Sequence, residues 1–117
     1  MRVGTPSAYR AGMDSHADLI ERMAALRVRV AGGDRSLLGE MEKTLTQGYA
    51  AALWGEAQLA RLEERLERIL VPGGGSRADH YDAVTRRHRA LEASVAALRS
   101  ELATAYAEFV ASGGGAR

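Results

Sequence analysis

The chain has 117 residues, enough for one domain. Hydrophobic residues make up 46% of it and charged residues 26%, which are ordinary values for a folded soluble domain. The 16 basic and 15 acidic residues nearly cancel, which argues against a dedicated nucleic-acid-binding protein, an acidic tail or a polybasic membrane anchor. Because cysteine is absent, disulfides, thiolate metal sites and cysteine nucleophiles are excluded.

No stretch of the sequence is suited to crossing a membrane. The uncharged run at residues 44–55 is well short of the roughly 20 apolar residues that a bilayer requires. Residues 1–15 lack the apolar region of a secretory signal. We therefore expect a cytoplasmic protein with no membrane partner, and the bias toward Ala, Arg, Gly and Leu favours a bacterial source.

Glycine-rich breaks divide the chain into three helical segments. The breaks lie at residues 32–33, 72–75 and 113–115, and each follows a segment of helical pattern, as helix stop signals do. Each segment is preceded by residues suited to cap a helix N-terminus, namely Asp14 or Ser15, Asp34 or Ser36, and Ser76. This punctuation predicts helices over residues 15–31, 35–70 and 77–111, in a single domain over 14–112 with a flexible leader at 1–13 and a flexible tail at 113–117.

The first segment has the pattern of an amphipathic helix. Its apolar residues recur at intervals of three and four and are Leu19, Met23, Leu26 and Val30. His16 continues this stripe by one turn toward the N-terminus, and we interpret it as a residue at the boundary between core and solvent.

The second and third segments carry paired seven-residue rows, the pattern of a coiled coil. The rows of the second segment are Leu38, Leu45, Ala52, Leu59 and Leu66, and Met41, Gly48, Gly55, Leu62 and Ile69. Those of the third are Tyr81, His88, Val95, Leu102 and Phe109, and Val84, Leu91, Leu98 and Ala105. The short connection between the segments makes them antiparallel neighbours. The predicted fold is therefore all-α: a long antiparallel helical hairpin with a shorter N-terminal helix packed on one half. It has a three-helix head and a two-helix arm over about residues 55–93.

Two glycines lie in a predicted core row. Gly48 and Gly55 each cost about 1 kcal/mol in a helix interior relative to alanine. Glycine lets a neighbouring backbone or bulky side chain approach closely, and the facing stretch at residues 90–97 is rich in alanine. We therefore favour close helix contact at both positions, with a hinge in the second helix as the alternative.

Three large apolar residues lie off the predicted core rows and form the candidate interface. They are Tyr49, Leu53 and Trp54. The first helix is expected to cover Tyr49, with Leu53 at the limit of this coverage, while Trp54 lies near the end of that helix's reach. Tryptophan and tyrosine are favoured anchors at interfaces, so packing within the chain and contact with a partner both remain open for Trp54.

The polar residues form no convincing catalytic or metal site. His80 and His88 are eight residues apart, and no cysteine or carboxylate cluster completes a metal set. We interpret His88 as a partly buried residue with a hydrogen bond. Arg86, Arg87 and Arg89 form the one dense basic run and are the weak candidate for contact with a small anion; solvated or paired charges are the simpler interpretation. We expect no catalytic residues and no cofactor.

The function expected from this pattern is non-enzymatic. A helical hairpin with leftover apolar surface indicates an interaction or scaffold protein, and the simplest partner is a second copy, giving a homodimer. The alternative is a small bacterial transcriptional regulator that acts by sequestration, as an anti-sigma-like helical hairpin, with an anionic ligand at Arg86, Arg87 and Arg89.

Overall fold

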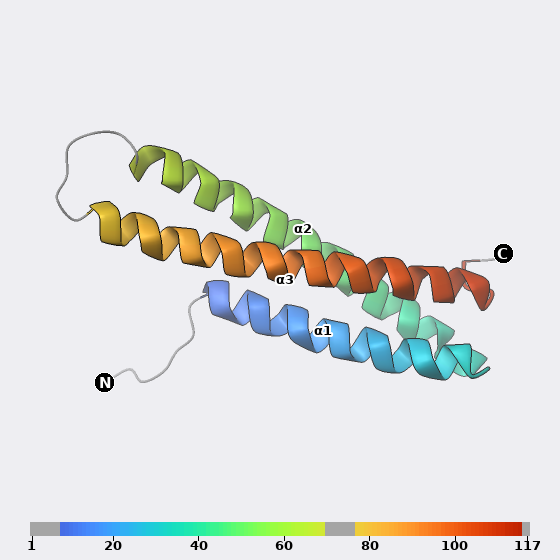
Figure 1. Ribbon diagram of the computed structural model, residues 1–117. Helices are drawn as coiled ribbons and strands as arrows, with labels where there is room; N and C mark the ends of the chain where they lie inside the picture. Colours follow the sequence, from blue (N-terminus) through green and yellow to red (C-terminus); the bar gives the residue numbers. More distant parts are fainter. Residues whose placement is uncertain (1–7, 70–76, 116–117) are drawn as a thin grey trace.

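The computed structural model describes residues 8–69 and 77–115, with side-chain surroundings for 15–69 and 78–115. The described residues form three long helices and one short 3₁₀ turn, and they contain no strand (Figure 1). The elements are α1 (Ala8–Ala31), η1 (Arg35–Leu37), α2 (Leu38–Ile69) and α3 (Arg77–Ala111). None of these helices is long and apolar enough to span a bilayer.

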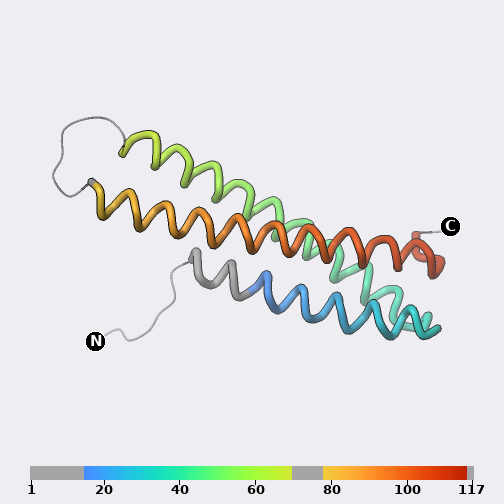
Figure 2. Tube along the Cα trace, viewed as in Figure 1, coloured from blue at the N-terminus to red at the C-terminus, as the bar shows by residue number. Residues whose placement is uncertain are grey.

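The long hairpin predicted from the sequence is confirmed. Helices α2 and α3 run antiparallel, and α1 runs parallel to α3 along the half of the hairpin that holds the end of α3 (Figure 2). The third helix has the predicted bounds. The second begins with the 3₁₀ turn at Arg35 and is described as far as Ile69, while the predicted last residue, 70, lies outside the described part of the chain.

The start of α1 differs from the expectation. The helix begins at Ala8, seven residues before Ser15, so Ser15 lies inside the helix and does not cap it. Residues 8–14 include two alanines, an arginine and a methionine, which favour a helix, and Gly12, which disfavours one; the helix runs through all of them and past the capping signal. The leader expected at residues 1–13 is therefore helical from Ala8, and residues 1–7 lie outside the described part of the chain.

Glycines end α1 and α3 with the same hydrogen-bond pattern. After α1, Gly33 adopts a φ of 102°, and the N–H of Asp34 donates to the carbonyl of Arg29 at 3.1 Å. After α3, Gly113 adopts a φ of 96°, and the N–H of Gly114 donates to the carbonyl of Phe109 at 2.7 Å. Both are Schellman motifs, in which a left-handed glycine lets the chain reverse over the last helical carbonyls. The breaks predicted at residues 32–33 and 113–115 are thus confirmed.

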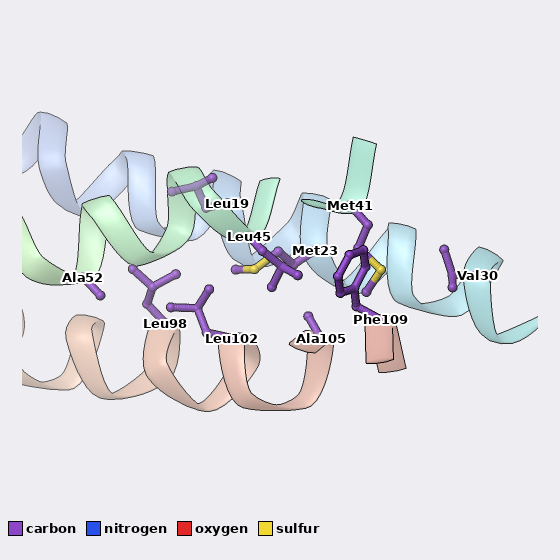
Figure 3. Close-up of a cluster of buried hydrophobic side chains, with 10 residues drawn as sticks. All are labelled: Leu19, Met23, Val30, Met41, Leu45, Ala52, Leu98, Leu102, Ala105 and Phe109. Atoms are coloured by element: carbon purple, nitrogen blue, oxygen red, sulfur yellow. The ribbon is translucent and has the colours of Figure 1, made fainter. Parts of the chain in front are cut away.

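The buried side chains form two clusters along the hairpin. The larger one draws on all three helices and comprises Leu19, Met23, Val30, Met41, Leu45, Ala52, Leu98, Leu102, Ala105 and Phe109 (Figure 3). The smaller one comes from α2 and α3 and comprises Leu62, Val84, Leu91 and Val95. Every position of the predicted seven-residue rows is buried or half-buried. The three-helix head and the two-helix arm are therefore both present.

Both glycines in the core row of α2 lie in close helix contact. A Cβ at Gly48 would lie 2.6 Å from Cδ2 of Leu102, and one at Gly55 would lie 2.6 Å from Cγ2 of Val95. Such separations are far below van der Waals contact, so a larger residue at either position would require the Leu102 or Val95 side chain to shift. Helix α2 is continuous through both positions. Close packing, rather than a hinge, is the reason for these residues.

Candidate functional site

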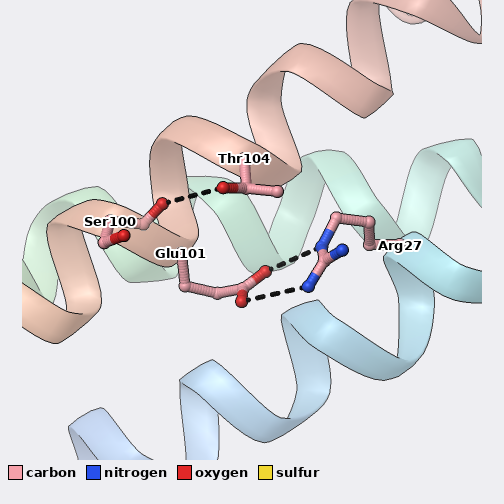
Figure 4. Close-up of polar contacts among 4 residues, drawn as sticks. All are labelled: Arg27, Ser100, Glu101 and Thr104. Atoms are coloured by element: carbon pink, nitrogen blue, oxygen red, sulfur yellow. Dashed lines mark hydrogen bonds and ion pairs between the residues drawn. The ribbon is translucent and has the colours of Figure 1, made fainter.

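Two polar contacts show which side of α3 faces α1. The Arg27 guanidinium donates to the Glu101 carboxylate, from Nε to Oε2 at 3.1 Å and from Nη2 to Oε1 at 3.3 Å (Figure 4). Nδ1 of His16 lies 2.8 Å from the hydroxyl of Ser94. Ser94 and Glu101 are two helical turns apart and therefore lie on the same side of α3.

An ion pair marks the opposite side of the hairpin. Nη2 of Arg99 lies 2.6 Å from Oε1 of Glu56 and so joins α3 to α2. Arg99 is two residues from Glu101, which is about 200° around the helix. Glu56 is likewise two residues from Trp54, whose ring lies edge-on to His16 of α1. The Glu56–Arg99 side of α2 and α3, which faces away from α1, is called the open face below.

Four of the five large hydrophobic residues that are exposed in the described part of the chain lie on the open face. They are Tyr49 and Leu53 of α2, exposed by 38% and 63%, and Tyr106 and Val110 of α3, exposed by 51% and 49%. The two α2 residues precede Glu56 by seven and three positions, and the two α3 residues follow Arg99 by seven and eleven. Such spacings return to the same side of a helix. The fifth exposed residue is Val28, on α1.

Tyr49 and Tyr106 lie at neighbouring levels of the hairpin, with Leu53 and Val110 one turn beyond them in opposite directions. Gly48, next to Tyr49, packs against Leu102, which is one turn from Tyr106. The exposed Ala103 lies on the same side of α3, one turn from Arg99, and adds a small residue between the larger ones. Tyr49, Leu53, Tyr106 and Val110 are called the open-face patch.

The structure divides the interface predicted from the sequence. Tyr49 and Leu53 are one turn apart and both belong to the open-face patch, so the expectation that α1 covers Tyr49 is wrong. Trp54 follows Leu53 directly and therefore points about 100° away. Its half-buried ring lies 6.3 Å from the His16 ring at an interplanar angle of 81°. Trp54 thus packs within the chain, against α1.

Tyr106 and Val110 were not among the residues predicted for the interface. Each directly follows a core residue, Ala105 and Phe109 respectively, and the two are spaced by one turn. Both residues are apolar and lie on the same side of the core row, and this sequence signal could have identified them. A seven-residue pattern alone does not show which flank a third helix covers.

The basic run does not converge on one point. Arg86 and Arg89 are exposed and three residues apart, so they share a side of α3, whereas Arg87 points to another side. His88, between them, is half-buried, and its Nε2 lies 3.4 Å from Oε1 of Glu63, as expected for a partly buried histidine with a polar partner. Contact between the arginines and a small anion stays a prediction.

Among the residues whose side chains are described, no three histidine, aspartate or glutamate residues are grouped so as to hold a metal ion. The sequence matches no protein-family model, and neither a curated protein nor a solved structure is detectably similar to it. Any inference about function therefore rests on the contacts and exposures within this chain.

Proposed function

We propose that this chain is a non-enzymatic protein–protein interaction module that forms a homodimer through its open face. The observation that carries the proposal is the gathering of Tyr49, Leu53, Tyr106 and Val110 on the one side of the hairpin that α1 leaves uncovered. Contiguous exposed apolar residues mark interaction surfaces, and tyrosine is enriched in the buried centres of interfaces. We further propose a cytoplasmic location, which the absence of cysteine supports.

A second copy is the occupant that this surface suits best. In a two-fold dimer the same patch meets itself, so it must not carry a strong charge of one sign at its centre. Two of the charged residues beside the patch, Glu56 and Arg99, neutralise each other across 2.6 Å. Glu42, which is exposed and seven residues before Tyr49, adds a single negative charge at the edge of the patch. The patch also combines large side chains with the small Ala103, which allows the larger residues of one copy to pack beside the smaller residues of the other.

Sedimentation equilibrium of the full chain tests the proposal. We expect the wild type to sediment largely as a dimer at about 100 μM, a concentration at which association of about 5–6 kcal/mol or stronger is populated. Leu53→Glu and Tyr106→Glu place a charge in the patch and are expected to shift the chain to monomer, because a buried unpaired carboxylate opposes association.

Val28→Glu is the matched control. Val28 is as exposed as Leu53 but lies on α1, away from the patch, so its substitution should leave the dimer intact. Far-UV circular dichroism establishes that each variant keeps its helical content. A wild type that remains monomeric at about 100 μM, a concentration that detects dissociation constants into the high micromolar range, contradicts the proposal. A Val28→Glu variant that dissociates as readily as Leu53→Glu also contradicts it.

A further inference from the structure

A histidine is enclosed at the point where all three helices meet. His16 of α1 is 1% exposed, with Nδ1 against the Ser94 hydroxyl of α3 at 2.8 Å and its ring edge-on to Trp54 of α2. Gly55 of α2 provides the space, since a Cβ there would lie 3.2 Å from Cε1 of the imidazole. Nε2 is buried and has no hydrogen-bond partner among the described residues.

These surroundings favour the neutral ring. The groups that face it are Ala51, Trp54 and Gly55 from α2 and Ser94 from α3, none of which ionises near neutral pH. Two carboxylates of α2 and α3 are paired with arginines: Glu101 with Arg27, and Glu56 with Arg99 on the open face. Burial therefore lowers the pKa of His16 below its usual 6.5, and the carbonyl of Ala51 opposes this shift only in part.

We propose that His16 is a pH-sensitive latch, which holds the N-terminal half of α1 on the hairpin when neutral and releases it when protonated. In the released state the ring is hydrated and binds a proton at its ordinary pKa, whereas the latched state binds it less readily. The released state therefore takes up more protons as the pH falls through 6.5, and acidification favours release. Well above this pH neither state binds the proton, so the histidine does not favour release.

Release is confined to one end of α1. In the C-terminal half of α1, Met23 and Val30 remain in the core cluster, and Arg27 remains paired with Glu101. The turn at Gly33 also holds the C-terminal end of α1 to η1. Opening of the N-terminal half uncovers Trp54 and the notch at Gly55, a surface distinct from the open face and therefore independent of the homodimer proposal.

Trp54 is the only tryptophan and reports directly on the latch. Its emission maximum and its quenching by acrylamide are to be measured between pH 8 and pH 5, the range in which histidine titrates. We expect a red shift and stronger quenching as the pH falls below 6.5. A protonated imidazole beside Trp54 can lower its emission without any movement of α1. Quenching by acrylamide rises only when the indole ring becomes exposed to solvent, so it distinguishes the two cases.

Three variants assign the transition. In His16→Gln the side chain can still bond to Ser94 but cannot ionise, so the pH-dependent rise in quenching should disappear, whereas His80→Gln and His88→Gln should retain it. Should His16→Gln fail to fold, an NMR titration of the His16 Cε1–H in the wild type replaces it, with a pKa below 6.5 expected. Quenching that does not change between pH 8 and pH 5, or an unchanged rise in His16→Gln, overturns the proposal.

Discussion

The side chains that face the two glycines of the α2 core row explain why glycine occupies these positions. Leu102 and Met23 approach Gly48, and Val95 and His16 approach Gly55. Glycine costs about 1 kcal/mol in a helix interior, and close contact between α2 and the other two helices offsets this cost. The residues therefore act on packing and not on the conformation of α2.

Substitution of Gly55 by alanine should destabilise the chain despite the better helix propensity of alanine. Overpacking of a filled core costs typically about 1–3 kcal/mol, which equals or exceeds the gain of about 1 kcal/mol from propensity. Gly39→Ala is the control, because nothing lies within 4 Å of a Cβ at that position of α2. Urea unfolding should show a lower midpoint for Gly55→Ala and an unchanged or higher one for Gly39→Ala; the reverse order contradicts the packing account.

His16 shows why single residues at the edge of a pattern are hard to place from sequence. It continues the stripe of α1, which led to its interpretation as a boundary residue, yet it is among the most buried side chains. Its burial depends on space left by Gly55 and on a hydroxyl from Ser94. Both lie far away in the sequence, so periodicity within α1 carries no information about them.

At the scale of elements, the position of α1 depends on its contacts with α3 as much as on its connection to α2. The Arg27–Glu101 pair is partly buried, with the carboxylate side chain 13% exposed, and its two hydrogen bonds fix the guanidinium in one plane. The Glu56–Arg99 pair between α2 and α3 is more exposed, at 47% and 39%. Solvent screens the second pair more strongly.

Double-mutant cycles should therefore separate the two ion pairs. Substitution of Arg27 and Glu101 by glutamine, singly and together, should give a coupling free energy of about 0.5–1 kcal/mol, and the cycle at Glu56 and Arg99 should give less. Thermal or urea unfolding at low and high salt provides the measurement. Equal coupling in the two cycles would show that the burial of the Arg27–Glu101 pair has no energetic effect.

The elements themselves follow from the sequence to different degrees. Seven-residue rows over the whole length of α2 and α3 predict both helices and their core sides, because many residues report the same period. The position at which α1 begins depends on weak helix propensities of a few residues, and the predicted start at residue 15 was wrong. The side of the hairpin that α1 covers was also misjudged at Tyr49, because the choice between two flanks depends on contacts such as Arg27–Glu101.

At the scale of the whole molecule, the chain is elongated and its core is uneven. Its radius of gyration is 18.4 Å, against roughly 13 Å for a compact domain of about this size. Ten residues from three helices form the head cluster, and four residues from two helices form the arm cluster. A two-helix arm buries fewer apolar contacts for each residue, so its local stability is lower.

Hydrogen exchange should reveal this gradient. Amides of the arm, at residues 59–69 and 81–90, should exchange faster than those of the head, at residues 41–52 and 98–109. Both regions are helical, so the difference tests packing rather than secondary structure. Mass spectrometry of peptic fragments at neutral pH gives the measurement, and equal protection in both regions contradicts the account.

The parallel pairing of α1 with α3 also affects how the chain folds during its synthesis. Partners in this contact are far apart in sequence: His16 and Ser94 by 78 residues, Arg27 and Glu101 by 74. A helix that leaves the ribosome early therefore has no complete groove to occupy until the last third of the polypeptide has emerged. Until then its leucine and methionine side chains remain uncovered and are open to capture by chaperones. Completion of the head is consequently one of the final events of synthesis.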